Sequence, residues 1–188
     1  MVQIVLQPSA DAHARAHYED TIHRPVELSA VRSKIEPQTF KHLKSLFPNG
    51  KVPMWGVTPG KTGGNQSKWE KVELGALVLF SADNKIYGCG VVAAKFHNKA
   101  LARHLWDVDP SGATWEWMYA LAEVRSLDIS YRDFNKAVGY KLNYVIQGFN
   151  VLDEAKSQAF MDTFDLHGKR LEWPPNPQDV KRAIKEFE

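Results

Sequence analysis

The sequence predicts an α+β domain built around one central β-hairpin. The first strand of the hairpin is expected at 76–81 and the second at 86–94, because both runs are rich in β-branched and aromatic residues. Between them, Asp83 and Asn84 favour a tight turn, since both residue types tolerate a positive φ. A third strand is expected at 115–127, after a short helix at 98–105. Helical patterns flank this region on both sides, and the combination indicates an α+β fold.

The composition is compatible with a single hydrophobic core and excludes an intrachain disulfide. At 188 residues and 44% hydrophobic, the chain can bury a sizeable core in a single domain with an appended helical piece. Its single cysteine, Cys89, excludes an intrachain disulfide and is expected to be buried as a small apolar residue. No run approaches the ~20 apolar residues of a membrane span, and no signal pattern opens the chain. We therefore expect a cytoplasmic protein with no membrane partner.

Further elements are expected along the chain from periodicity and capping residues. A strand is predicted at 1–6, a helix capped by Ser9 at 10–22, a helix at 36–47, a helix from Ser130 to Gly139, a strand region at 144–151, a helix capped by Asp153, and a last helix starting at Asn176.

Two motifs resemble sites of other chemistry and are rejected. His13 and His17 share a helix face, but no third ligand recurs at a convincing spacing, so no metal site is predicted. Gly60-Lys61-Thr62 resembles the end of a phosphate-binding loop, but Trp55 stands where that motif needs glycine, and Gly63-Gly64-Asn65 are expected to continue a loop. No cofactor and no nucleotide hydrolysis are predicted.

A net charge of +2 is too small to indicate nucleic-acid binding by bulk charge. Binding would need a local basic patch. The main candidates for contacts to phosphate are Lys61, Lys68, Lys95, Lys99 and Arg103. Lys136 and Lys141, near the later helix, are further candidates. These residues form either one basic face or ordinary solvated surface, depending on whether the fold gathers them.

Tryptophan is the distinctive residue type of the central region. Five of the six tryptophans lie in or near the hairpin: Trp55, Trp69, Trp106, Trp115 and Trp117. They form either a large aromatic core or a cage for a flat ligand. Trp115 and Trp117 alternate within the expected third strand and should therefore point to one face.

Several motifs in this region resemble the EVE and YTH domains of the PUA-like superfamily. They are Met54-Trp-Gly-Val-Thr58, Gly75-Ala-Leu-Val-Leu-Phe-Ser81, Ile86-Tyr-Gly-Cys-Gly-Val-Val92, Leu105-Trp106 and Trp115-Glu-Trp-Met-Tyr-Ala-Leu-Ala-Glu-Val124. The resemblance covers about 52–152 and is strongest to the recognition domains of modification-dependent restriction systems of the McrBC type. It implies a strongly bent β-barrel with flanking helices that flips a modified base into an aromatic cage.

The resemblance also implies which residues form the site. Carried over by motif, the cage consists of Trp55, Trp106 and Trp115, which leaves Trp69 and Trp117 as a structural pair. We expect the cage tryptophans to be more open than the structural pair, so that their loss removes selectivity without unfolding the domain. Groups that could read the edge of the base are Gly56, Val57, Ser81, Asp83 and Asn150. Pro53 and Met54 replace the polar residues that precede the first cage tryptophan in YTH readers, so the base and its modification are not defined.

The expected partner is double-stranded DNA that carries a modified base, with this chain as the targeting module of a restriction enzyme. Three parts are expected: 1–50 packing on the barrel, the barrel at 51–152, and helices at 153–188 leading to a nuclease or motor domain. The chain alone is expected to cleave nothing, because no catalytic set has usable spacing. Two alternatives stay open: a reader of modified RNA, and a small hydrolase or ribonuclease of the ASCH kind.

Overall fold

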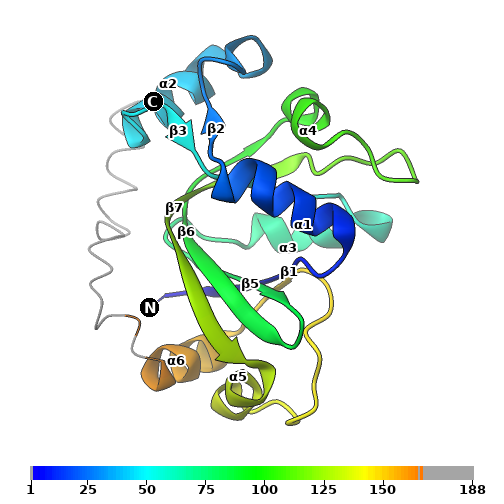
Figure 1. Cartoon of the computed structure of the whole chain (residues 1–188), viewed down its shortest axis with the longest axis vertical. Helices are drawn as coiled ribbons and strands as arrows, with labels where there is room; N and C mark the ends of the chain where they lie inside the picture. The colour runs from blue at the N-terminus through cyan, green and yellow to red at the C-terminus, as the bar shows by residue number, and fades with distance from the viewer. Residues whose placement is uncertain (1, 165, 167–188) are drawn as a thin grey trace.

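One curled sheet forms the centre of the computed structural model, which describes residues 2–164 and 166. The strands of this sheet are β1 (Ile4–Pro8), β4 (Met54–Val57), β5 (Leu77–Ala82), β6 (Lys85–His97), β7 (Trp117–Ser130) and β8 (Asn150–Val151). They lie in the order β4-β7-β6-β5-β1-β8. A separate small sheet pairs β2 (Val26–Glu27) with β3 (Lys51–Val52). Figure 1 shows the long β6 and β7 curving through the middle of the molecule.

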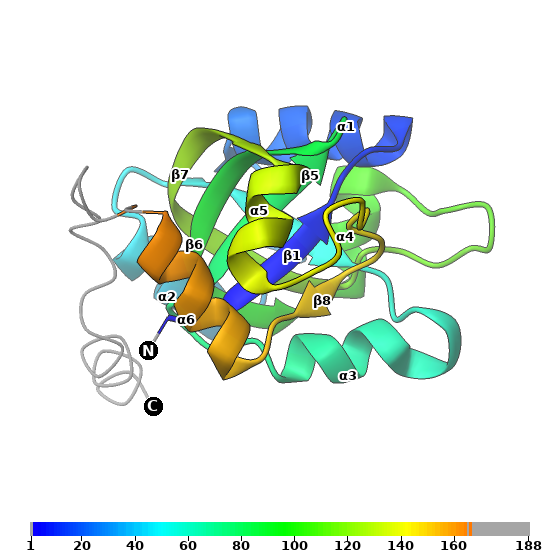
Figure 2. The same ribbon diagram turned by 90° about the horizontal axis from the view of Figure 1, so that it is seen from below.

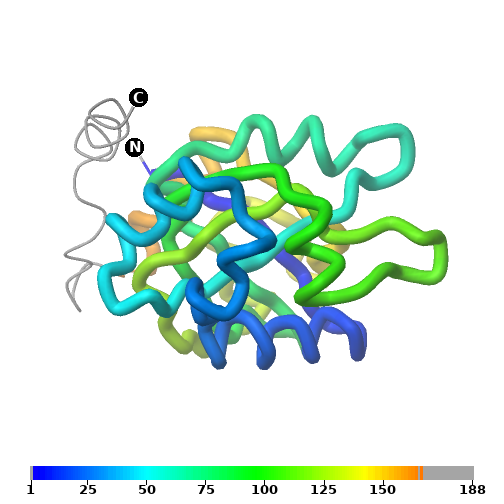
Figure 3. The backbone as a smooth tube through the Cα atoms, turned by 90° about the horizontal axis from the view of Figure 1, so that it is seen from above, coloured from blue at the N-terminus to red at the C-terminus, as the bar shows by residue number. Residues whose placement is uncertain are grey.

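The helices surround this sheet. They are α1 (Ala12–Tyr18), α2 (Pro37–Leu46), α3 (Gly64–Glu70), α4 (Lys99–Trp106), α5 (Tyr131–Val138) and α6 (Glu154–Thr163). Shorter turns are the π-helix η1 (Glu19–His23) and the 3₁₀ helices η2 (Arg32–Lys34) and η3 (Lys61–Gly63). Figure 2 shows α1 along the top and α3 along the bottom of the view, with the strands, α5 and α6 between them. Figure 3 shows the loop that follows α4 projecting from the same end of the molecule as η3.

The hairpin prediction is confirmed, and irregular pairing explains why the sheet bends. Asp83 and Asn84 form the turn with φ of 51° and 61°. The β6–β7 ladder shifts register at three places, between Ile86 and Gly88, between Cys89 and Val91, and between Val92 and Ala94. Each bulge adds twist and bends the strand, so the six-stranded sheet curls strongly, as expected for a bent β-barrel.

Three apolar clusters form the core. One packs α5 and α6 against the sheet through residues such as Leu79, Phe134 and Phe160, and a second packs Trp55, Phe80 and Tyr119 under α1 and α3. The third joins α2 and α4 to the sheet through Leu43, Leu101 and Met118. Cys89 is buried as expected, and burial raises the pKa of its thiol. None of the described helices combines the length and the apolar character needed to cross a membrane.

The first helix differs from its prediction. Its cap is Asp11, whose carboxylate accepts from the Ala14 amide at 2.9 Å, and the helix changes to a π-helical turn after Tyr18. Ser9 instead bonds along the sheet: its amide donates to the Ser81 carbonyl at 2.9 Å and its hydroxyl lies 2.6 Å from that of Tyr87. The cap prediction failed because Ser9 is occupied by tertiary contacts, and Asp11 is the next residue able to cap.

Three further predictions need correction. Gly63-Gly64-Asn65 do not continue a loop, because α3 begins at Gly64. Of the strand region at 144–151, only Asn150 and Val151 pair in the sheet. Trp115 and Trp117 do not share a face, because Trp115 precedes β7 and packs with the third cluster whereas Trp117 packs with the second. The helix expected from Asn176 lies outside the described residues.

Candidate nucleic-acid interface

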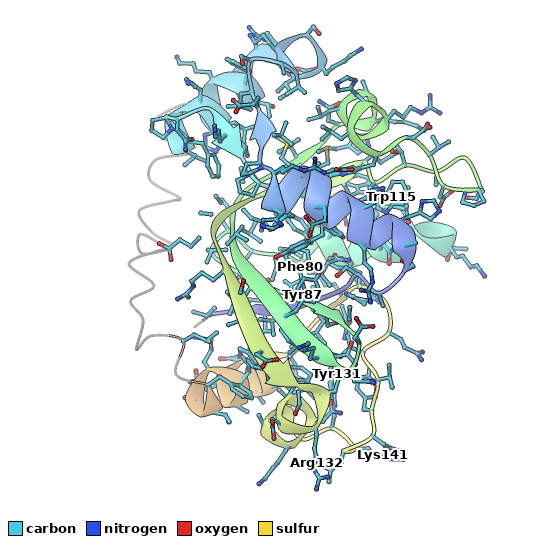
Figure 4. All side chains as sticks on the ribbon, viewed as in Figure 1. Phe80, Tyr87, Trp115, Tyr131, Arg132 and Lys141 are labelled. Atoms are coloured by element: carbon cyan, nitrogen blue, oxygen red, sulfur yellow. The ribbon has the colours of Figure 1, made fainter. Side chains whose placement is uncertain are left out.

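Three tryptophans from separate segments lie around one imidazole. Trp55 lies on β4, Trp106 is the last residue of α4, and Trp115 lies in the segment that leads into β7. The ring centroid of His17 lies 6.4 Å from that of Trp55, 5.7 Å from Trp106 and 4.3 Å from Trp115. Figure 4 shows Trp115 beside α1. We call these four residues the tryptophan cluster.

The cluster depends on a glycine in β4. A Cβ atom on Gly56 would lie 2.0 Å from the Trp115 carbonyl oxygen and 2.9 Å from Cζ3 of Trp106. Neither distance is possible for a real side chain, so only glycine lets both residues approach Trp55. The loop between the two tryptophans is braced as well, because the Thr114 hydroxyl donates to the Asp107 carbonyl at 2.8 Å.

A hydroxyl fastens the helix that carries His17 to β4. Oγ1 of Thr21 lies 2.8 Å from the carbonyl oxygen of His17 and 2.7 Å from that of Met54. The imidazole is buried, and no hydrogen bond to its ring occurs among the described residues. Burial lowers the pKa of His17 to about 4, and the nearby His13 adds to this effect. At neutral pH the cluster therefore holds a neutral heteroaromatic ring.

Tyr18, the next residue, covers another side of Trp55. Its ring centroid lies 6.4 Å from that of Trp55 and 5.0 Å from those of Phe80 and Tyr87. Phe80 in turn contacts Trp55 at 5.1 Å. Figure 4 shows Phe80 and Tyr87 on the sheet beneath α1. Trp55 is thus enclosed by aromatic rings on several sides and is only 2% exposed.

The expected contrast between open cage and closed core is not found. Trp55 is 2% exposed and Trp106 is 7% exposed, against 9% for Trp69, while Trp115 and Trp117 are half-buried. Trp69 and Trp117 do contact one another at 5.1 Å. The reason is that His17 and Tyr18 come from α1, whose packing over β4 the sequence pattern did not reveal.

Several indole N–H groups in this region find no acceptor among the described residues. Nε1 of Trp55, Trp106 and Trp117 is buried and makes no hydrogen bond within that part of the chain, whereas Nε1 of Trp69 donates to the Met118 carbonyl at 3.2 Å. A buried donor without an acceptor is uncommon and unfavourable, and a ligand that accepts hydrogen bonds relieves it. Two of these donors belong to the tryptophan cluster.

The five predicted cations do not surround one opening. Lys68 donates to the Phe149 carbonyl at 2.9 Å, and Lys95 donates to the carbonyls of Glu70 and Val72 while lying 4.4 Å above the Trp69 ring. These two ammonium groups therefore hold the fold together. Lys61 is exposed on η3.

The other two predicted cations share an open hollow of about 570 Å³ on α4 and η2. It is lined by Lys34, Lys99, Ala100, Arg103 and His104, and we call it the basic hollow. The side chain of Asn98 donates to the Lys34 carbonyl at 2.7 Å and so joins η2 to α4. Lys99 has Glu116 as a partner at 3.7 Å, but no ion pair of Lys34 or Arg103 occurs within residues 2–164. The basic hollow lies on the same helix as Trp106.

The predicted base-edge groups are dispersed. Gly56 and Val57 are buried in β4, and Asn150 lies on β8 at the opposite edge of the sheet order. The hydroxyl of Ser81 is buried and has no hydrogen-bond partner in residues 2–164. Asp83 forms an ion pair with Arg15 at 2.7 Å and lines a different hollow of about 490 Å³, between α1 and the hairpin.

Within the described residues, no group of three or more His, Cys, Asp and Glu side chains is placed to hold a metal ion. His13 and His17 separate because His13 is exposed while His17 turns into the cluster. Sequence reasoning considered His17 only as a metal ligand. The signal it overlooked was the Tyr that follows, since the pair His17-Tyr18 is the part of α1 that meets the aromatic face of the sheet.

Solved structures show what this arrangement is similar to. The N-terminal domain of Thermococcus gammatolerans McrB, solved bound to m5C DNA, aligns over 90% of this chain and 99% of its own, with a TM-score of 0.64 and 15% identity. The chain has the fold of this McrB domain. The YTH domain of Zygosaccharomyces rouxii MRB1, solved with N6-methyladenosine RNA, aligns over 88% of both chains at 12% identity, but its TM-score of 0.45 is too low to support an argument.

No family model and no curated protein sequence matches the chain. The likeness to the McrB domain is therefore one of fold, at an identity too low to transfer a binding residue. It confirms the α+β architecture and the bent barrel with flanking helices.

Proposed function

We propose that this chain reads a modified base in DNA and receives the flipped base at the tryptophan cluster. The observation that carries the proposal is the convergence of Trp55, Trp106 and Trp115 at one point, in a fold shared with a McrB domain solved on m5C DNA. Stacking on an aromatic side chain contributes ~1–3 kcal/mol per base. A methyl group in a fitting apolar pocket adds ~1 kcal/mol. Together these terms offset the few kcal/mol that base flipping costs.

The indole donors give the cluster a polar component. Nε1 of Trp55 and Nε1 of Trp106 are buried donors that have no acceptor in the described part of the chain, and base edges carry ring nitrogens and carbonyl oxygens that accept hydrogen bonds. In this proposal one indole stacks on the face of the base, and another, oriented edge-on to the base, donates its N–H to the base edge. Gly56 and Val57, with Ser81, Asp83 and Asn150, stay as lesser candidates for that reading.

The basic hollow supplies the phosphate contacts. Lys99 and Arg103 were predicted for this role, and Lys34 and His104 join them in the fold. Trp106 is three residues beyond Arg103 at the end of the same helix, so a strand held at the hollow is placed near the cluster. Lys61 can add a contact from η3, whereas Lys68 and Lys95 contribute less because their ammonium groups bind carbonyls of the chain.

The biological role that fits is the targeting module of a modification-dependent restriction enzyme. In that role a nuclease or motor domain supplies cleavage, and this chain supplies selection. We propose accordingly that the chain alone is not an enzyme.

A binding array tests the proposal directly. The purified chain is titrated with matched duplex DNA and RNA oligonucleotides that carry 5-methylcytosine, N6-methyladenine or no modification, at one fixed salt concentration. We expect tighter binding to one modified DNA than to its unmodified twin. Preference for a modified RNA would show that the ligand is RNA and not DNA. Equal binding to all the oligonucleotides would refute the reader function. Cleavage by the purified chain with Mg²⁺ or Mn²⁺ would favour the hydrolase alternative.

A further inference from the structure

The tryptophan cluster leaves no room for a base beside His17. A base inserted between the imidazole and one of the indoles would need those two rings roughly 7–8 Å apart, which is twice the contact distance between carbon atoms. The centroids of the three indoles lie only 4.3 to 6.4 Å from that of the imidazole. The position that a flipped base would take is therefore filled by a side chain of the protein itself.

The imidazole is also chemically close to what it excludes. Like a base, it is a flat, neutral heteroaromatic ring with one nitrogen donor and one nitrogen acceptor. It packs edge-on to Trp115, with an interplanar angle of 85°, and makes its contacts through ring packing alone among the described residues. A ring held only by packing can be exchanged for another ring that packs as well and also accepts from the indole N–H groups.

The backbone beneath this ring is fixed, so the exchange requires movement of the side chain. Thr21 ties the carbonyl of His17 to β4 through contacts of 2.8 Å and 2.7 Å. Helix departure would break this link, whereas rotation about the Cα–Cβ bond leaves it intact. A helical residue has two common χ1 rotamers, which gives His17 one alternative direction.

We call the position among Trp55, Trp106 and Trp115 that a flipped base would take the base seat. From these observations we propose that the side chain of His17 occupies the base seat in the unbound protein and is displaced by the flipped base. This inference rests on the proposed function, because the incoming ring is the modified base. His17 then sets the affinity of the reader: the seat is available only in the fraction of molecules whose imidazole has rotated away.

Two substitutions of His17 act in opposite directions. His17→Ala empties the seat, so a competing state disappears and affinity for a duplex with one 5-methylcytosine should rise. If the open state is populated at about 10%, the rise is about tenfold. His17→Phe fills the seat with a ring that packs well and cannot easily leave, so it should weaken binding to the methylated duplex. His13→Ala, on the exposed face of the same helix, is the matched control and should bind as the wild type does.

A second measurement tests the seat without DNA. Free imidazole, added at millimolar concentration, should raise the melting temperature of His17→Ala by a few degrees, because a ligand that binds only the native state stabilises it. It should not raise the melting temperature of the wild type or of His17→Phe, whose seats are filled. If His17→Ala is too unstable to assay, weaker binding by His17→Phe than by the wild type still has to be observed.

The outcomes separate this inference from the proposed function. Weaker binding of methylated DNA by a folded His17→Ala would overturn the inference and make His17 a contact of the base. Unchanged binding by both variants would also overturn it. Stabilisation of His17→Ala by imidazole, with no preference of any variant for modified DNA, would support an exchangeable seat and refute the base as its ligand.

Discussion

The imidazole of His17 meets the indole of Trp115 edge-on, with their ring centroids 4.3 Å apart. The two residues are 98 positions apart in the chain, and they meet because α1 crosses the sheet at β4 while the segment before β7 passes over Gly56. Their contact forms one side of the tryptophan cluster. Trp115 is the half-buried member of that contact, so it is the better residue for separating recognition from folding.

Trp115→Ala should leave a folded protein that has lost most of its preference for modified DNA. Its ring is only half-buried, so its removal should cost less stability than the ~3–5 kcal/mol typical of a core tryptophan. Trp55→Ala, at 2% exposure, should reach that range. A thermal melt beside a binding titration measures both effects. A Trp115→Ala protein that is folded and still selects the modified duplex would exclude Trp115 from the site.

Gly56→Ala should destabilise the domain by about 3 kcal/mol or more, because its Cβ would lie 2.0 Å from a backbone oxygen that can move only with the loop. The control is Gly64→Ala at the start of α3, where no atom lies within 4 Å of the added Cβ and φ is −63°. That change should be neutral or stabilising by ~0.4–1 kcal/mol. Urea unfolding curves give both values, and equal effects at the two sites would contradict the close approach over Gly56.

Arg103→Ala should weaken binding to modified and unmodified duplexes alike, since phosphate contacts position a protein without reading sequence. The slope of log affinity against log salt should become shallower by about 0.9 for each phosphate that the variant no longer neutralises. Lys34→Ala should behave in the same way.

Arg132→Ala is the control for these two changes, because Arg132 lies at the opposite end of the molecule from Trp115 (Figure 4).

Lys95→Ala should instead lower the melting temperature, since the ammonium group of Lys95 donates to two carbonyls and covers the Trp69 ring. A Lys95→Ala protein of unchanged stability and reduced salt slope would return Lys95 to the phosphate contacts.

Acid should destabilise the wild type more than His17→Phe. The pKa of His17 is lowered to about 4 in the folded protein, against about 6.5 when unfolded, so the unfolded state binds more protons between these values. Stability from the neutral ring is present above pH ~6.5 and declines as the pH falls toward 4. The charged groups that act on it are His13, which lowers the pKa further, and Asp11 and Asp20, which raise it.

Melting temperatures from pH 7.5 to 4.5 measure this difference. Burial also lowers the pKa of His42, but His42 is present in both proteins, so its contribution cancels in the comparison. Parallel pH profiles for the wild type and His17→Phe would show that folding does not lower the pKa of His17.

The local features of this protein follow from its amino-acid sequence alone. The Asp83-Asn84 turn, the helix from Ser130 to Gly139 and the cap at Asp153 depend on residues that act on their own backbone within a few positions. The bent barrel was implied by the resemblance of the motifs around Trp55 and Trp106 to EVE and YTH domains. Three other features became visible only in the folded chain. The ring of His17 lies among the tryptophans, the ammonium group of Lys95 binds backbone carbonyls, and Lys34 lines the same hollow as Arg103. Each of these contacts joins segments far apart in the chain, and periodicity and capping carry no information on which face of one segment meets another.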